Sequence, residues 1–429
     1  MGHAKGGIVK RTSVGLAAVA ASAVALGAMA STSLGGQRQN EVKDLKLGIL
    51  TPLSGDLASF GGIGQKASEL AQGQLNEAAK AAGLTLNVTL AVQDTKTDKT
   101  AAQEAATKLI DSEKVSCIAG PWASSEVIAV SDNVSAEAGV PIVSPSSTNP
   151  DVTKLKDNGY TFRTAPSDAL QGKVLAQVMG KAIGKNATVN TGSRNDSYGI
   201  ALVREFSKAW KAGGGKIGVN VPWNPKATSL NSEAGRLVKG NPKAWMVVDF
   251  TDSWPKMSAA LVRTGKWEAK RTFSTDGLKG DKLPKLAGKK GTDGMRGTAA
   301  TADPAAATST AFSALWTSKN TGDRGTYDDF NFDATVICAL AAVKANSTAP
   351  GDVAKQIQAV SGPPGTKYTF QQLKEALTDV AAGKDIDYEG ASGPIDMNGA
   401  GDPTAALYAT WTYKGGKLVN LPKPVYRIK

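Results

Sequence analysis

The hydrophobic positions of this chain follow two spacings in turn, one typical of strands and one typical of helices. Every second position is hydrophobic in one strand-like run, which consists of Leu84, Leu86, Val88, Leu90 and Val92. The segment before it, from about 64 to 82, has apolar residues at helical spacing and is ended by Gly83. With a further strand predicted at 45–50, these segments form a strand–helix–strand unit.

The stretch from 117 to 151 repeats this arrangement in compact form. It predicts a strand, a tight Gly-Pro loop, a helix opened by serines, a Gly stop, a second strand and a hydroxyl-rich loop. Repeated alternation of strands and helices is typical of a doubly wound parallel sheet. Such a sheet brings the loops at the carboxyl ends of its strands to one edge, where ligands bind.

The alternation restarts after residue 168 and predicts a second α/β unit, with strands at 187–191, 217–221, 244–250 and 272–275. The last third does not make a third complete unit, since it predicts only helices near 308–319, 329–346 and 370–381 and a hairpin over 407–419. We therefore expect an α/β fold of two doubly wound, parallel-sheet lobes, joined by a hinge of several crossings.

The expected first lobe comprises residues 45–160 and 290–385, and the second lobe comprises 161–289 and 386–429. A cleft between two hinged lobes is the natural place for a ligand.

Residues 1–30 have the pattern of a secretory signal peptide, because a basic segment is followed by an apolar, Ala-rich run and an A-x-A site at 28–30. We expect cleavage before Ser31 and a polar tether over 31–44. The mature protein would then be secreted, or lie in the periplasm or cell envelope. The alternative is an uncleaved membrane anchor.

The chain of 429 residues carries a formal net charge of +12. Residues 1–30 contribute three positive and no negative charges, so the mature charge is 12 − 3 = +9. The lysines and arginines are dispersed, without a basic run interleaved with aromatic residues, so no nucleic-acid partner is expected.

The only histidine, His3, leaves with the signal peptide. This excludes Ser-His-Asp and Cys-His catalysis and His-ligated zinc from the mature chain. The two cysteines, Cys117 and Cys338, fall inside an apolar strand and an apolar helix. Export permits a disulfide, but we expect two separate buried thiols.

No cofactor or metal is expected. Gly62-x-Gly64-x-x-Ala67 matches a dinucleotide fingerprint by its letters, but the turn after the first strand is too long and no acidic residue follows at the required spacing. The sequence also lacks a phosphate-binding G-x-x-x-x-G-K-[ST] loop and the G-x-S-x-G nucleophile motif.

Hydroxyl groups follow two neighbouring strands of the predicted first sheet, at Ser124, Ser146 and Thr148. Each hydroxyl alone could cap a helix or turn, but together they form a candidate polar ligand site. Asp276 follows a second-lobe strand and could pair with a ligand ammonium, or cap a helix.

Aromatic residues on strand-end loops supply candidate walls for an apolar pocket. Tyr198 precedes a glycine and could offer both a ring and a hydroxyl to a ligand, while Phe60 and Trp122 could provide apolar walls. Core packing is the alternative interpretation for each of these rings.

The order of several segments resembles the type I periplasmic binding proteins, and within them the leucine/isoleucine/valine-binding group that feeds ABC importers. The segments, spread over Leu45 to about Lys417, are GILTPLSG, GPWASS, SPSSTNP, FRTAPSD, DSYG, TDG, FNFDA and GASGPIDMNGAGD. No single motif decides the likeness, which depends on their order and spacing.

The resemblance implies a role for each candidate residue. Ser124 and Thr148 would contact the carboxylate and ammonium of an amino acid, and the carbonyl of Ser146 would take part. Tyr198 and Asp276 would close on the ligand from the second lobe. Two residues depart from the family pattern, and they leave the ligand's side chain open: the Phe60 position is often tyrosine, and Trp122 is bulkier than usual.

The resemblance implies a monomeric binding protein that captures an amino acid, an amide or a related small molecule between closing lobes and delivers it to an ABC permease. Two alternatives stay open. One is a secreted α/β enzyme acting on a small amide or amino-acid derivative, with carboxylates or a lysine as its catalytic groups. The other is a sensor subunit that reports the ligand to a membrane receptor.

Overall fold

The computed structural model describes Gly2, residues 42–319 and residues 322–428. The predicted signal peptide, apart from Gly2, and the predicted tether up to residue 41 therefore lie outside the described residues. Within the described ranges, no helix is long and apolar enough to cross a bilayer.

The first sheet has five parallel strands in the order β2-β1-β3-β4-β5. They are β1 (Asp44–Thr51), β2 (Asn87–Asp94), β3 (Cys117–Ala119), β4 (Ile142–Ser144) and β5 (Thr161–Arg163). Alternate residues of β1 join different hydrophobic clusters, since Leu47 and Ile49 pack into one and Leu50 into another. Both faces of this sheet are therefore covered, as is typical of parallel sheets.

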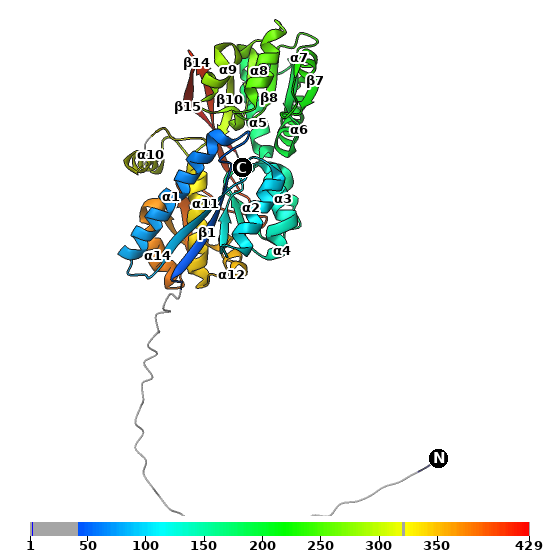
Figure 1. Ribbon diagram of the computed structural model, residues 1–429. Coiled ribbons are helices and arrows are strands. Elements are labelled where there is room, and N and C mark those ends of the chain that lie inside the picture. The colour runs from blue at the N-terminus through cyan, green and yellow to red at the C-terminus, as the bar shows by residue number, and fades with distance from the viewer. Residues whose placement is uncertain (1, 3–41, 320–321, 429) are drawn as a thin grey trace, which may run out of the picture. The chain divides into compact units, whose positions relative to one another are not determined.

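Helices around this sheet complete the part we call the first lobe (Figure 1). They are α1 (Ala58–Ala81), α2 (Lys99–Asp111), α3 (Ser124–Val130), the π-helix η1 (Ser131–Ser135), α4 (Ala136–Ala138), the 3-10 helix η2 (Pro150–Lys154), α10 (Ala307–Lys319), α11 (Asp328–Ala345), α12 (Pro350–Ala354), α13 (Ile357–Val360), the 3-10 helix η5 (Phe370–Gln372) and α14 (Leu373–Ala381). The central helix is α11, whose residues from Asp328 to Val343 are all buried. Its part from Val336 to Val343 is apolar on all sides, and such a helix belongs in a core.

The second sheet has seven strands in the order β15-β14-β10-β9-β8-β6-β7. They are β6 (Thr188–Arg194), β7 (Lys216–Trp223), β8 (Ala244–Val248), β9 (Thr272–Ser274), β10 (Arg296–Ala300), β14 (Ala406–Lys414) and β15 (Lys417–Ile428). The first five of these run parallel, and β14 and β15 add an antiparallel hairpin at one edge. The tight turn of the hairpin requires positive φ at Gly415 and Gly416, which glycine adopts without strain.

The second sheet and its helices form the part we call the second lobe. These helices are α5 (Asp168–Ile183), α6 (Ser197–Ala212), α7 (Asn231–Leu237), α8 (Trp254–Arg263), the 3-10 helices η3 (Ala269–Arg271) and η4 (Asp276–Leu278), and α9 (Leu283–Thr292). The strand–helix alternation and the two sheets confirm the predicted fold class of two α/β lobes.

The assignment of the late segments to lobes differs from the expectation at three strands, β10 (Arg296–Ala300), β12 (Ile386–Gly390) and β13 (Gly393–Pro394). β10 pairs with β9 and β14, so the chain stays in the second lobe beyond residue 289. A third, small sheet contains β11 (Thr366–Thr369), β12 (Ile386–Gly390) and β13 (Gly393–Pro394), and its Ile386 and Tyr388 pack into the core of the first lobe. The chain therefore returns to the second lobe only after β13.

The expectation of two separate thiols is wrong, because Cys117 and Cys338 form a disulfide. Strand β3 and helix α11 contact each other in the core of the first lobe, which brings the two Cα atoms to 5.8 Å. This distance is ordinary for a disulfide. The bond links the strand that leads into the first hydroxyl loop to the central helix of the lobe.

Candidate functional site

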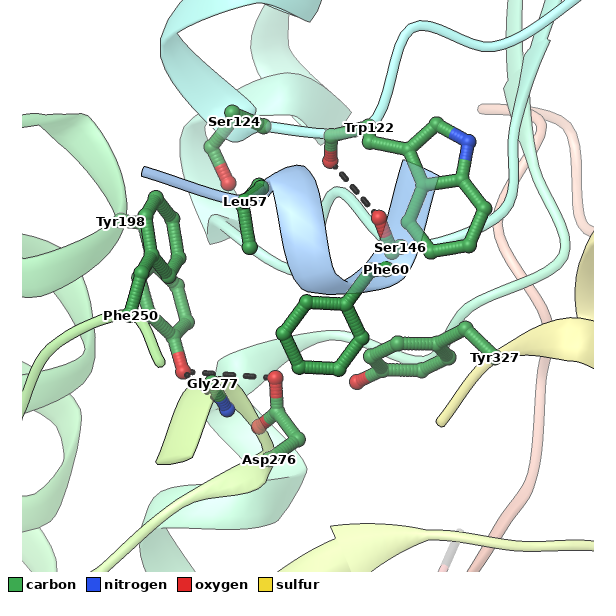
Figure 2. A pocket seen from close by; sticks show the side chains of 11 residues that line it. Leu57, Phe60, Trp122, Ser124, Ser146, Tyr198, Phe250, Asp276, Gly277 and Tyr327 are labelled. Carbon is green, nitrogen blue, oxygen red and sulfur yellow. Dashed lines mark hydrogen bonds between the residues drawn. The ribbon is translucent and has the colours of Figure 1, made fainter. Parts of the chain in front are cut away.

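One pocket is lined by residues of both lobes (Figure 2). Six of the seven predicted site residues line it, namely Phe60, Trp122, Ser124, Ser146, Tyr198 and Asp276. The other lining residues are Leu57, Ala123, Phe250, Gly277 and Tyr327. The two predicted hydroxyl loops and the second-lobe acid thus meet at a single place.

The first hydroxyl loop, between β3 and α3, is fixed by close backbone packing. Gly120 has φ +115°, and a Cβ there would lie 2.1 Å from the carbonyl oxygen of Leu50, so only glycine fits. The Trp122 indole lies against Gly64 of α1, where a Cβ would come within 2.3 Å of the ring. Trp122 is 2% exposed, so the ring serves both as core and as pocket wall.

A buried carboxyl group supports the same loop from behind. The backbone N–H of Ala123 donates to Glu126 Oε2 at 2.9 Å. Burial raises the pKa of Glu126 to about 8, in spite of this hydrogen bond. The side chain is therefore predominantly protonated at neutral pH.

The second hydroxyl loop, after β4, is tied to the first by its own side chains. The Ser146 hydroxyl donates to the carbonyl of Trp122 at 2.8 Å, and the N–H of Asn149 donates to the Ser124 hydroxyl at 3.3 Å. The buried guanidinium of Arg163 donates to the carbonyls of Ser147 and Asn149 at 3.2 and 3.0 Å. These bonds hold both loops in one rigid group.

Thr148 is the one predicted site residue that does not line the pocket. Its side chain is 1% exposed, and its carbonyl accepts a hydrogen bond from the N–H of Asp168 at 2.7 Å. Thr148 therefore lies behind the wall, beside Asp168 at the start of α5.

The second lobe contributes a tyrosine–aspartate pair. Tyr198, near the start of α6, shares a hydrogen bond of 2.8 Å with the Thr275 hydroxyl and donates to Asp276 Oδ2 at 3.3 Å (Figure 2). The Tyr198 ring stacks on Phe250 with centroids 5.3 Å apart. Tyr198, Phe250 and Asp276 are all at least nine-tenths buried.

Two buried carboxyl groups lie close enough to affect each other's ionisation. Burial raises the pKa of Asp168 well above its ordinary value, and the charge of Asp276 raises it further. The pKa of Asp276 is also raised, chiefly by burial. Among the described residues, neither carboxylate forms an ion pair with lysine or arginine. The charge of Arg163 lowers the pKa of Asp168, and the side chains of Gln171 and Tyr198 lower that of Asp276, but burial outweighs these effects.

Sequence reasoning missed two polar groups of this site. Tyr327, the residue before α11, has φ +67°, which is unusual for a bulky side chain, and its buried hydroxyl has no hydrogen-bond partner. Asp168 has the sequence signature of an ordinary residue in the first turn of a helix. Neither position carries a local signal, because tertiary packing alone brings Tyr327 to the pocket and Asp168 to a place behind its wall, close to Asp276.

The arrangement is suited to holding a small molecule with a positive charge. Buried acidic and phenolic groups lie on one side, aromatic rings and aliphatic side chains form the walls, and hydroxyls of the first lobe lie opposite. A buried carboxylate without a partner is costly, so an ammonium group would find a favourable place here. Within the described part of the chain, no group of three or more His, Cys, Asp or Glu could hold a metal.

The fold and the site together define a solute-binding protein of two lobes. The profile of the family described as "Periplasmic binding protein" matches residues 44–408, and the chain belongs to that family. This confirms the predicted family and, with it, a binding protein rather than an enzyme.

Relatives agree with this assignment. The chain is 31% identical over 173 residues to the Leu/Ile/Val-binding protein BraC3 of Rhizobium johnstonii, which covers 40% of this chain and 45% of that one. It is 25% identical over 378 residues to BasB of Halobacterium salinarum, a substrate-binding protein of a chemotactic signal transduction system, covering 83% of this chain and 84% of that one. The chain spans only about half the length of some relatives. For a relative from Methanocaldococcus jannaschii, the matching region covers 54% of that protein.

A solved structure shows the same fold. The leucine-binding protein LivK of Thermotoga maritima superposes with a TM-score of 0.72 at 21% identity, covering 90% of this chain and 99% of that one. The predicted type I periplasmic-binding-protein fold is therefore confirmed.

Proposed function

We propose that this chain is the extracytoplasmic substrate-binding protein of an ABC importer, and that it captures an amino acid, or a related small molecule with an ammonium group, between its two lobes. The observation that carries the proposal is the buried pair Asp168 and Asp276, neither of which forms an ion pair with a lysine or arginine among the described residues. The charge of Arg163 lowers the pKa of Asp168, but burial outweighs it and the pKa stays raised. The relatives named for leucine, isoleucine and valine support an amino acid as the ligand.

In the proposed complex, the ammonium group lies against Asp276, with Asp168 behind it and the Tyr198 hydroxyl beside it. The ligand carboxylate faces the hydroxyls of Ser124 and Ser146. An apolar side chain packs among the rings that line the pocket. Each ligand group is thereby matched to a protein group of complementary chemistry.

The electrostatic balance favours an ammonium ligand over a simple carboxylic acid. One solute-binding protein of the same fold, from R. palustris, was solved with benzoate. A benzoate-like ligand would bring a further negative charge to two buried carboxyl groups without neutralising either. An amino acid brings the missing positive charge.

A ligand panel tests the proposal. Isothermal titration of the purified protein would compare L-amino acids with benzoate and with the matching acids that lack the amine. We expect saturable binding of at least one amino acid and no binding of its amine-free analogue. Binding of benzoate or a deaminated analogue, with no binding of any amine, would contradict the proposal.

A sensor subunit is the second candidate function, because BasB, which serves chemotaxis, matches over most of both chains. Both functions use the same ligand site and differ in the membrane partner. Copurification from membranes with the ligand present would separate them, since an ABC permease or a receptor would be recovered.

Export of the mature chain as a monomer is part of the proposal. The predicted cleavage gives a mature protein that begins at Ser31. N-terminal sequencing of the protein recovered outside the cytoplasm checks the cleavage site. The mass of the protein in solution checks whether it is a monomer. An uncleaved N-terminus would favour the membrane anchor instead.

A further inference from the structure

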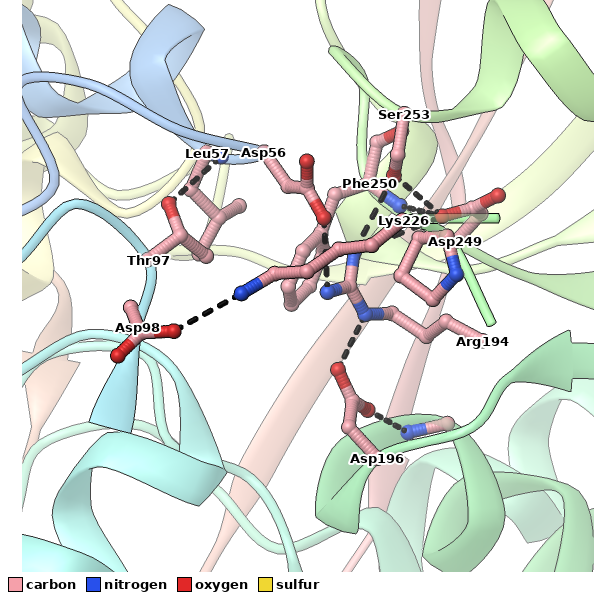
Figure 3. A network of polar contacts seen from close by, with 12 residues as sticks. Asp56, Leu57, Thr97, Asp98, Arg194, Asp196, Lys226, Asp249, Phe250 and Ser253 are labelled. Carbon is pink, nitrogen blue, oxygen red and sulfur yellow. Dashed lines mark hydrogen bonds and ion pairs between the residues drawn. The ribbon is translucent and has the colours of Figure 1, made fainter. Parts of the chain in front are cut away.

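The segment between β1 and α1 is held against the second lobe by a group of polar contacts (Figure 3). The guanidinium of Arg194, at the end of β6, donates from Nη2 to Asp56 Oδ2 at 3.1 Å. The N–H and hydroxyl of Ser59 donate to the Asp252 carboxylate at 2.9 and 2.8 Å. Both contacts join a residue of the first lobe to one of the second.

Arg194 also has partners within its own lobe. It forms an ion pair with Asp196, another with Asp249 at 3.5 Å, and a hydrogen bond from Nη1 to the Ser253 hydroxyl at 3.2 Å. Arg194 is 4% exposed, so these partners offset the cost of burying its charge. If the lobes separated, Arg194 would lose Asp56 and remain paired.

Arg194 also contacts the wall of the ligand pocket from behind. Its guanidinium carbon lies 3.7 Å from the centre of the Phe250 ring, within the range of a cation–π contact. Phe250 stacks on Tyr198, and both rings line the pocket. On the other side of the ion pair, Asp56 directly precedes Leu57, which also lines the pocket.

We propose that Arg194 is a positioning residue for ligand capture, whose ion pair with Asp56 forms on closure of the lobes and holds the Phe250–Tyr198 wall and Leu57 against the ligand. This inference rests on the proposed function, because it assumes that the pocket binds the ligand. Asp56 is the exchangeable partner, since its side chain is 29% exposed and can be rehydrated on opening. A partly exposed pair of this kind stabilises closure only modestly, which keeps release possible.

The test compares two inter-lobe ion pairs. Asp56→Asn removes the charge that Arg194 contacts across the cleft. Asp98→Asn is the matched control, because Asp98 also pairs across the lobes, with Lys226 at 2.9 Å, but both side chains are more exposed and neither forms an ion pair with Arg194. Asparagine can replace Asp98 as the N-cap of α2. Asp56→Glu retains the charge and should restore the wild-type behaviour.

The first readout is the dissociation rate of the tightest-binding amino acid of the panel, measured by stopped-flow tryptophan fluorescence. We expect Asp56→Asn to dissociate about three- to tenfold faster, with an association rate within about twofold of the wild type. Added salt should accelerate dissociation from the wild type more than from Asp56→Asn. Unchanged dissociation in Asp56→Asn, or an equal increase in Asp98→Asn, would overturn the proposal.

The second readout needs no ligand. Spin labels on the two lobes would report the distance distribution of the ligand-free protein, and Asp56→Asn should have a smaller closed population than the wild type or Asp98→Asn. If no amino acid binds, the proposed function fails, whereas this measurement still tests the role of Arg194. Identical distributions in all variants would overturn it.

Discussion

At the scale of single residues, Asp276 and Asp168 show how burial changes the chemistry of a common side chain. Both are almost inaccessible to water, and among the described residues neither forms an ion pair with lysine or arginine, although the charge of Arg163 partly offsets the burial of Asp168. Folding therefore places two acids where ionisation is unfavourable. We interpret this cost as one that a ligand ammonium offsets.

The first prediction concerns Asp276→Asn, which keeps the size of the side chain and removes its charge. We expect the affinity for the amino acid to fall about tenfold or more, because a buried ammonium would lose its partner. Calorimetric titration measures the change. Asp387→Asn is the control, since Asp387 is equally buried in the small sheet, outside the pocket, and its variant should bind normally. An unchanged affinity in Asp276→Asn would place the ammonium elsewhere.

At the scale of elements, the sequence predicted the kinds and order of strands and helices better than their ends. The sequence predicted a helix that starts near residue 64, because the preceding segment is rich in glycine. In the structure this helix begins at Ala58, six residues earlier. Glycines lower helix propensity, but Gly61 lies where a Cβ would be 2.0 Å from the carbonyl oxygen of Pro52. Close packing, rather than flexibility, explains that glycine, and packing cannot be read from local sequence.

The sequence predicted those site residues that lie just after the carboxyl ends of strands. Ser124, Ser146 and Asp276 each follow a strand of a parallel sheet, so topology alone brings them to the cleft. Tyr327 was missed because its position depends on how distant segments pack. Phe250 was missed because the predicted strand ran to residue 250, whereas β8 ends at Val248 and leaves Phe250 in the loop. The disulfide was missed because Cys117 and Cys338 are 221 residues apart, and only the packing of the first lobe brings them together.

The second prediction concerns the loop between β3 and α3, which Glu126 supports. The pKa of Glu126 is raised by burial from 4.5 to about 8, so the protonated side chain stabilises the fold. This contribution is complete below about pH 4.5 and is lost as the pH rises through 8. We expect the free energy of unfolding to fall by roughly 1.4 kcal/mol per pH unit in that window from this group.

Glu126→Gln can still accept the hydrogen bond from Ala123 but cannot ionise. Urea unfolding of the ligand-free protein, at several pH values between about 5 and 8, should show a shallower decline for this variant. Other buried acids, such as Asp333 with a pKa of about 7, add a decline common to both proteins. If the free energy of unfolding fell equally with pH in the wild type and in Glu126→Gln, the ionisation of Glu126 would not destabilise the fold, and the prediction would be wrong.

At the scale of the whole molecule, the pocket exists only when both lobes contribute to it. Ser124 and Trp122 belong to the first lobe, whereas Tyr198, Phe250 and Asp276 belong to the second. Three connections cross between the lobes, after β5, after β10 and after β13. In the function proposed above, closure about these crossings would couple occupation of the site to the arrangement of the lobes, and a membrane partner would recognise that arrangement.

The last prediction follows from that coupling. At a ligand concentration about a hundredfold above Kd, binding to the folded protein alone adds about 2.7 kcal/mol to the free energy of unfolding, which corresponds to a rise of about 3 °C in Tm for a chain of this size. Small-angle X-ray scattering should show a smaller radius of gyration with the same ligand. Asp276→Asn, at the same ligand concentration, should show less of both changes. A rise in Tm without compaction would mean that the ligand binds to one lobe and leaves the hinge open. Stabilisation needs only binding to the folded protein, whereas compaction needs contacts between the ligand and both lobes.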